Sequence, residues 1–122
     1  MKSTLTNDQW SRAIQAVRDA THILMVAHVT PDADALGSAL ALGLALEGLG
    51  KRVRVSVGEA GFCIPDSLSF LPGSHLVVGP EAIDSPELVI SCDTSSVERL
   101  GVLSDVLKSA PSSIAIDHHA SF

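Results

Sequence analysis

The sequence predicts an α/β fold in which a parallel β-sheet is flanked by helices on both faces. Short apolar runs alternate with helix-type segments along the chain, which is the order that strand–helix–strand units produce. The 122 residues fit one domain, and an apolar content of 46% is enough to build a core. No internal repeat or low-complexity tract interrupts this order.

The first half of the chain predicts a helix, a strand and a second helix. Thr6 and Gln9 have the spacing of a capping box, and apolar residues follow on one helical face, so we expect a helix over Asn7–Ala20. The continuous apolar run Ile23–Ala27 is typical of a strand that is buried on both faces. An apolar helix is expected over Asp34–Leu49, followed by a glycine that can end it.

The second half continues the alternation. The alternating residues of Val53–Val57 predict a strand nearer an edge, and the Gly- and Pro-containing residues 58–75 predict a loop. Leu76–Val78 can form a brief strand. The remaining expected elements are a strand, a helix and a last strand, over Leu88–Cys92, Val97–Lys108 and Ser113–Ile116.

Composition excludes several functional classes. With 8 basic and 14 acidic residues the net charge is −6, so the chain as a whole is not a basic nucleic-acid-binding surface. An aromatic content of 3% argues against a base-stacking platform. The longest apolar stretch, Leu36–Leu49, is too short to span a bilayer, and the N-terminus has no signal-peptide apolar region. We therefore expect a cytoplasmic protein with reduced cysteines and no membrane partner.

Three predicted strands each end in residues of the types that bind metals. These residues are His28, Asp32 and Asp34 after the first strand, Asp93 after the Leu88–Cys92 strand, and Asp117, His118 and His119 after the last. Because right-handed crossovers put the carboxyl ends of parallel strands at one edge of the sheet, we expect these side chains to converge there. Asp93 should then lie within about 8 Å of Asp32 or His118, since metal–ligand bonds are only about 2.0–2.2 Å long.

Such a cluster predicts a metal centre. Several carboxylates in one cleft repel each other unless a cation compensates, and imidazole with carboxylate suits Mn²⁺, Mg²⁺ or Zn²⁺. Seven ligand-type groups exceed the need of one ion, which favours two ions about 3.5–4 Å apart, the usual arrangement for hydrolysing phosphate esters. The helix after the first strand can donate N–H groups to a phosphate, with Gly37 and Ser38 expected in its first turn.

Each candidate also has a simpler interpretation. An aspartate at a helix start, such as Asp32 or Asp34, is more often a cap than a ligand, and Asp93 could cap the helix that comes after it. We assign a purely structural role to three other residues, His22, His75 and Cys92. Three strands that end independently in metal-type residues favour the metal site. A flavodoxin-like or receiver-type domain would explain the aspartates but not the histidines.

These motifs resemble those of a known family. The stretch HVTPDADALGS, Asp93, and the triplet Asp117-His118-His119 look like the first three motifs of the DHH phosphoesterase superfamily, and the match covers most of the chain. The stretches VISCDTSSVERLG and GFCIPDSLSFLPGS are most similar to the bacterial nanoRNase (oligoribonuclease)/pAp-phosphatase branch. The resemblance implies that residues 1–122 form the amino-terminal domain of such a two-metal enzyme. Mn²⁺ is the expected metal, with Mg²⁺ as the alternative.

The resemblance also implies a role for each site residue. One ion would be bound by His28 and Asp32, the other by Asp34 and His118, and both by Asp93. Asp117 would orient the histidines, and His119 would face the substrate phosphate or the leaving group. Ala33 stands where the motif commonly has glycine, a mild change unless the φ angle there must be positive.

The sequence departs from the family pattern after the third motif. In the family a fourth-motif aspartate and a carboxy-terminal substrate-binding domain come later, whereas this sequence ends at Phe122. We therefore expect a truncated DHH amino-terminal domain that holds its second ion weakly and turns over slowly. The implied substrates are short RNA oligomers or 3′-phosphoadenosine 5′-phosphate (pAp). A cyclic-dinucleotide phosphodiesterase, an inorganic pyrophosphatase and an inactive metal- or nucleotide-binding module stay open, as does a homodimer.

Overall fold

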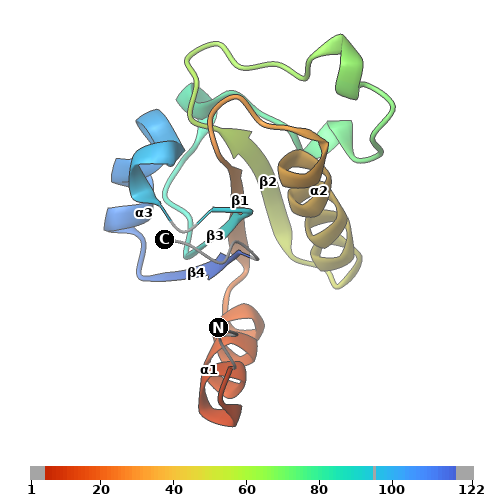
Figure 1. The fold of residues 1–122 in the computed structure, drawn as a ribbon. Helices are drawn as coiled ribbons and strands as arrows, with labels where there is room; N and C mark the ends of the chain where they lie inside the picture. The colour runs from red at the N-terminus through yellow and green to blue at the C-terminus, as the bar shows by residue number, and fades with distance from the viewer. Residues whose placement is uncertain (1–4, 95, 118–122) are drawn as a thin grey trace.

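The computed structural model describes residues 5–94 and 96–117, and in this part of the chain four strands form one parallel sheet (Figure 1). The strands are β1 (His22–Ala27), β2 (Arg52–Val57), β3 (Leu88–Cys92) and β4 (Ser112–Ile116). Their order is β2-β1-β3-β4, and every neighbouring pair runs parallel. The predicted parallel sheet is confirmed, and each strand boundary lies within one residue of its prediction.

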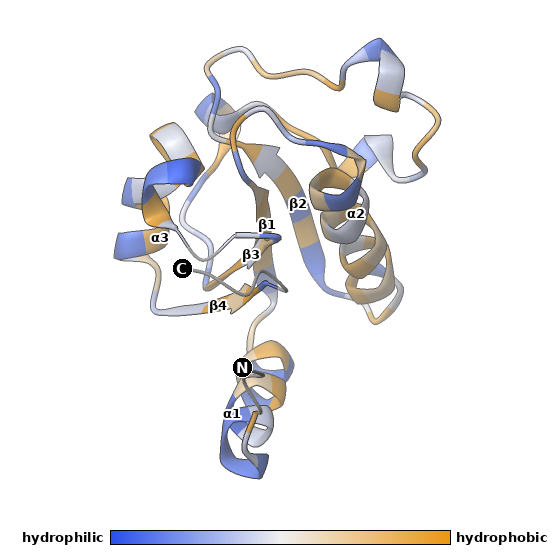
Figure 2. Ribbon diagram, in the orientation of Figure 1, coloured by the Kyte–Doolittle hydropathy of each residue, from blue (hydrophilic) through white to orange (hydrophobic). Residues whose placement is uncertain are grey.

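Helices cover both faces of this sheet. On one face α2 (Ala33–Gly48) packs against the strands through residues such as Leu36 and Leu40. On the other face Leu100 and Leu103 pack against β1 and β3, next to the short helix α3 (Ser104–Ser109). Figure 2 shows the central strands in apolar colours between these two layers. In the described residues no helix is both long and apolar enough to cross a membrane.

The first helix, α1 (Asn7–Asp19), projects away from the sheet (Figure 1). Its predicted capping box is confirmed, because the Gln9 N–H donates to Thr6 Oγ1 at 3.1 Å and the Thr6 N–H donates to Gln9 Oε1 at 2.8 Å. No residue within α1 is buried, and the Trp10 side chain is largely exposed. The start of this helix is therefore fixed by local hydrogen bonds more than by packing.

The predicted single helix over Val97–Lys108 is wrong. The structure instead has a 3₁₀ segment, η4 (Val97–Leu103), that is kinked at Gly101 (φ 58°, ψ −130°) and is followed by α3. The break is caused by close packing against the end of β2, where the Val102 N–H donates to the Gly58 carbonyl at 3.0 Å. A glycine is needed at position 101 because only glycine adopts this backbone conformation readily.

Two further elements differ from or qualify the predictions. The expected brief strand Leu76–Val78 is reduced to one isolated bridge between Val77 and Val55, because a 3₁₀ turn occupies Ser74–Leu76. The edge strand β4 is mostly exposed, with Ile114 half-buried and Ile116 50% exposed. β4 therefore contributes little to the core, although it pairs along its length with β3.

Replacing Gly58 by alanine should destabilise the fold strongly. A Cβ atom at Gly58 would lie 1.7 Å from the Leu100 carbonyl oxygen, so either β2 or η4 would have to move. We expect a loss of at least about 2 kcal/mol in the free energy of unfolding, measured by urea denaturation. The matched control is Gly48→Ala at the end of α2, where a Cβ meets nothing within 4 Å and helix propensity favours alanine. Equal losses in both variants would contradict the close-packing explanation.

Glu87 should make stability depend on pH in the acid range. Its Oε1 accepts hydrogen bonds from the Thr21 hydroxyl, the Thr21 N–H and the His22 N–H, and these bonds lower its pKa from 4.5 to about 2. Because the folded-state pKa is depressed, this contribution is complete above about pH 4.5 and is lost as the pH falls towards 2. At pH 7 Glu87→Gln should therefore have a lower melting temperature than wild type. This difference in melting temperature should become smaller below pH 4.5. A constant margin in thermal melts would contradict this assignment.

Candidate metal centre

A group of three potential ligands lies at the carboxyl edge of the sheet. His28 follows β1 and Asp93 follows β3, and these two strands are neighbours in the sheet. Asp32 comes from the loop between β1 and α2. One ligand atom from each of the three residues can be chosen so that all lie within 4.8 Å of one another. The structure thus brings together residues from two separate segments of the sequence.

The chemistry of the group and the spacing of its His28–Asp93 pair fit a divalent cation. His28 and Asp93 are buried, at 5% and 6% exposure, whereas Asp32 is exposed to solvent. His28 Nε2 lies 3.8 Å from Asp93 Oδ2. Two atoms bound to one ion at about 2.0–2.2 Å can be at most about 4.4 Å apart, so this spacing is compatible with a shared ion. Imidazole with carboxylate suits Mn²⁺, Mg²⁺ or Zn²⁺.

His28 is oriented by its second ring nitrogen. Nδ1 lies 2.8 Å from the Val29 carbonyl oxygen, and this contact directs Nε2 towards Asp93. The Val29 N–H in turn donates to the Arg99 carbonyl at 2.8 Å. A hydrogen bond from the ring nitrogen that does not bind the metal is the usual way in which proteins fix a ligating histidine.

Asp32 is a helix cap and a candidate ligand at the same time. Its Oδ1 accepts the Ala35 N–H at 2.9 Å, which makes it the N-cap of α2. A carboxylate has two oxygens and about four lone-pair sites, so capping leaves acceptor capacity for a cation. The cap and ligand interpretations of Asp32 are therefore compatible.

The backbone around the group is unusual. Among the described non-glycine residues, only Thr30 and Asp93 have positive φ angles, 51° and 66°. The Thr30 N–H donates to the Glu59 carboxylate, and the Asp93 N–H donates to the Ile116 carbonyl at 2.8 Å. Aspartate tolerates this conformation better than most residues, and such strain collects at functional sites. Both ligand-bearing turns are thus held by contacts from other strands or their ends.

Cys92 takes no part in the group. Burial, and then the negative charge of Asp93, raise the pKa of the Cys92 thiol to about 11. The thiol therefore stays protonated at neutral pH and serves as a small core residue, as its sequence context predicts. The predicted structural roles of His22 and His75 agree with their contacts, because their Nε2 atoms lie 3.3 Å from Asp84 Oδ1 and 2.8 Å from Glu47 Oε1.

Comparison with known proteins identifies the family. Residues 22–122 match the DHH family, N-terminal domain. The chain belongs to the DHH family. It is similar to the crystal structure of an exopolyphosphatase-related protein from Bacteroides fragilis, with a TM-score of 0.83 and 26% sequence identity. The match covers 99% of this chain and 37% of that one, so this DHH domain spans little more than a third of the protein that it resembles.

Two of the other four predicted metal-binding and catalytic residues lie in the described part of the chain, and two lie outside it. Asp34 is exposed in the first turn of α2 and is not a member of the three-residue group, and Asp117 is half-buried just after β4. His118 and His119 lie outside the described residues. The roles predicted for these four residues stay predictions.

The sequence predicts that Gly37 and Ser38 lie in the first turn of α2, but in the structure they come after that turn. The helix begins at Ala33, earlier than predicted, because Asp32 is its cap. Gly37 and Ser38 therefore come after the first turn, where backbone N–H groups are already used within the helix. A Cβ at Gly37 would meet only Leu71 Cδ2, at 3.8 Å, so packing does not require glycine there. Phosphate binding by these two residues stays a prediction.

Two residues at the centre are missing from the sequence-based predictions. Glu59 holds the backbone of Thr30, and Arg99 Nη2 lies 3.1 Å from His28 Nδ1. Glu59 lies just beyond the carboxyl end of β2, so the rule that identified His28 and Asp93 could have found it. Arg99 gives no such signal, because η4 reaches His28 only through the tertiary fold.

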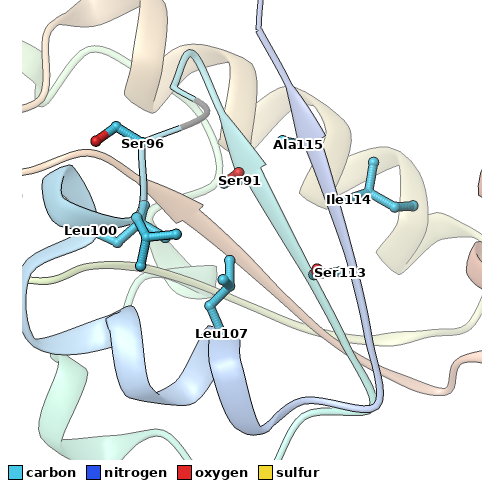
Figure 3. Close-up of a pocket in the computed structure, with 8 residues that line it drawn as sticks. Ser91, Ser96, Leu100, Leu107, Ser113, Ile114 and Ala115 are labelled. Carbon is cyan, nitrogen blue, oxygen red and sulfur yellow. The ribbon is translucent and has the colours of Figure 1, made fainter. Parts of the chain in front are cut away.

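A cavity of about 180 Å³ adjoins the loop that carries Asp93. Figure 3 shows Ser91, Ser113 and Ala115 on the strand side, facing Leu100 and Leu107 from η4 and α3. The Ser91 hydroxyl donates to the Thr94 carbonyl at 3.3 Å, so one wall of the cavity is tied to the turn after β3. The lining is mixed apolar and hydroxyl in character.

Two substitutions at Asp32 should separate its capping role from its charge. Asn is as good an N-cap as Asp, so Asp32→Asn should keep the metal-free stability, whereas Asp32→Ala should lose about 1 kcal/mol. Both variants lack the carboxylate and should show a smaller increase in melting temperature with Mn²⁺ than wild type. Thermal melts with and without Mn²⁺ measure both effects. An undiminished Mn²⁺ shift in both variants would remove Asp32 from the centre.

Proposed function

We propose that this DHH domain is the metal-binding part of a two-metal phosphoesterase that hydrolyses short oligoribonucleotides, pAp, or both. The observation that carries the proposal is the convergence of His28, Asp32 and Asp93 at one edge of the sheet. Membership of the DHH family, whose phosphoesterase domains are generally metal-dependent hydrolases, supports it. Mn²⁺ is the proposed metal and Mg²⁺ the alternative, with Asp34 and His118 proposed as ligands of the second ion.

Some residues of this chain would hold the metal ions, and others would contact the substrate phosphate. Ions held at this edge would supply Lewis acidity, activation of water and neutralisation of charge on the phosphate. The buried His28 and Asp93 keep their positions through backbone contacts, whereas the exposed Asp32 leaves the centre open to solvent. The N-terminus of α2, capped by Asp32, favours a phosphate anion near the same place. We propose Asp117 as the residue that orients the histidines and His119 as the group facing the substrate.

Short substrates agree with the charge of the chain. A net charge of −6 does not favour contact with many phosphates of a long nucleic acid, whereas a dinucleotide or pAp needs few. The similarity to an exopolyphosphatase-related protein favours a second candidate, hydrolysis of phosphoanhydrides such as pyrophosphate. We propose that the enzyme works in the cytoplasm with no membrane partner.

The test is a substrate panel combined with metal-dependent melting. pAp, dinucleotides, cyclic dinucleotides and pyrophosphate are offered with Mn²⁺ to the 122-residue chain and to any longer protein that contains it. We expect release of nucleotide or phosphate from pAp and dinucleotides above all. Mn²⁺ should also raise the melting temperature by mass action, and Asp93→Asn should abolish most of both effects.

His75→Ala is the control for this experiment. Its Nε2 lies 2.8 Å from Glu47 Oε1, outside the metal group, so this variant should keep the wild-type Mn²⁺ shift. Equal Mn²⁺ shifts in wild type and Asp93→Asn would contradict the metal centre. Turnover confined to pyrophosphate would favour the second candidate.

A further inference from the structure

Two contacts at His28 Nδ1 exclude each other as hydrogen bonds. Nδ1 lies 2.8 Å from the Val29 carbonyl oxygen and 3.1 Å from Arg99 Nη2. In a neutral imidazole, each ring nitrogen carries either a hydrogen or a lone pair. The carbonyl can only accept and the guanidinium can only donate, so Val29 and Arg99 favour opposite tautomers of His28.

We propose that Arg99 is a positioning residue that sets the tautomer of His28. On metal binding, the hydrogen-bond partner of His28 Nδ1 changes from the Arg99 guanidinium to the Val29 carbonyl. This inference rests on the proposed metal centre. In the metal-free tautomer Nδ1 accepts from Arg99, and the hydrogen sits on Nε2, which faces Asp93 Oδ2 at 3.8 Å. In the metal-binding tautomer Nδ1–H donates to Val29, and Nε2 offers its lone pair to the ion.

The exchange between these tautomers leaves the protonation count unchanged. One N–H bond breaks at Nε2 and one forms at Nδ1, with water carrying the proton between the two nitrogens. The Arg99 guanidinium stays charged throughout and loses only its acceptor. Arg99 therefore stabilises the metal-free form and weakens metal binding. A residue that merely held His28 in place would instead strengthen metal binding.

The backbone around Arg99 explains why its side chain is held at this place. The Arg99 carbonyl accepts the Val29 N–H at 2.8 Å, which joins η4 directly to the residue that competes for Nδ1. The contact between Val102 and Gly58 holds the same segment against the end of β2. None of these bonds uses the Arg99 side chain, so Arg99→Met should fold and keep its backbone position.

The tautomer can be read directly in the metal-free protein. Two-bond ¹H–¹⁵N correlation spectra at about pH 8 distinguish protonated from unprotonated ring nitrogens. We expect wild-type His28 to be mainly Nε2–H, and Arg99→Met to lower the ratio of Nε2–H to Nδ1–H about tenfold, the effect of one hydrogen bond to a charged donor. Arg54→Met, which removes a guanidinium that donates to the Val53 carbonyl, is the control and should leave the ratio unchanged.

Mn²⁺ affinity gives the second measurement, by titration calorimetry. Because only the Nδ1–H tautomer is competent to bind, Arg99→Met should raise the affinity by up to about tenfold. The gain should persist in about 0.5 M salt, where the long-range repulsion between an exposed cation and the metal is largely screened. An unchanged tautomer ratio, or weaker Mn²⁺ binding by Arg99→Met, would overturn the proposal. If wild type binds no Mn²⁺, the proposed centre is contradicted, while the tautomer ratio still decides the role of Arg99.

Discussion

In-register pairing of β1 with β3 puts Ala27 opposite Cys92, so that the next residue of each strand, His28 or Asp93, stands at the same edge of the sheet. A slip of one residue in this register would turn every side chain of one strand to the opposite face. The core prevents such a slip, because both strands are buried along almost their whole length. The metal group therefore depends on the same apolar packing that stabilises the domain.

The segment η4 adds a second constraint, which acts across the end of the sheet. Gly58 and Gly101 approach so closely that a Cβ on either would lie within 2.3 Å of a backbone oxygen of the other segment. Because of this contact η4 cannot continue as a regular helix, and its backbone bonds to Val29 instead. The two glycines thus allow the close approach that holds η4, the segment that carries Arg99, against the end of β2.

Local patterns in the sequence were sufficient for the strands, the capping box and the three residues that converge. Each of these features depends on residues close together in sequence or on a general rule of parallel sheets. The break at Gly101 and the contact of Arg99 with His28 could not be predicted, because both arise from segments that meet only in the folded chain. The start of α2 at Ala33 follows from the capping role of Asp32, and the two oxygens of this carboxylate allow it to be both a cap and a ligand.

A domain that binds metal through buried residues must also be stable before the metal arrives. At this centre the buried imidazole of His28 faces the buried carboxylate of Asp93, and burying a carboxylate is costly unless the groups around it compensate its charge. A hydrogen on Nε2 reduces this cost without metal, but it also blocks the position that an ion needs. A guanidinium on the far side of the ring can stabilise that arrangement without adding a ligand, which gives Arg99 a physical reason to lie against Nδ1. The affinity of the centre would then depend on the balance between Arg99 and the Val29 carbonyl as well as on the number of ligands.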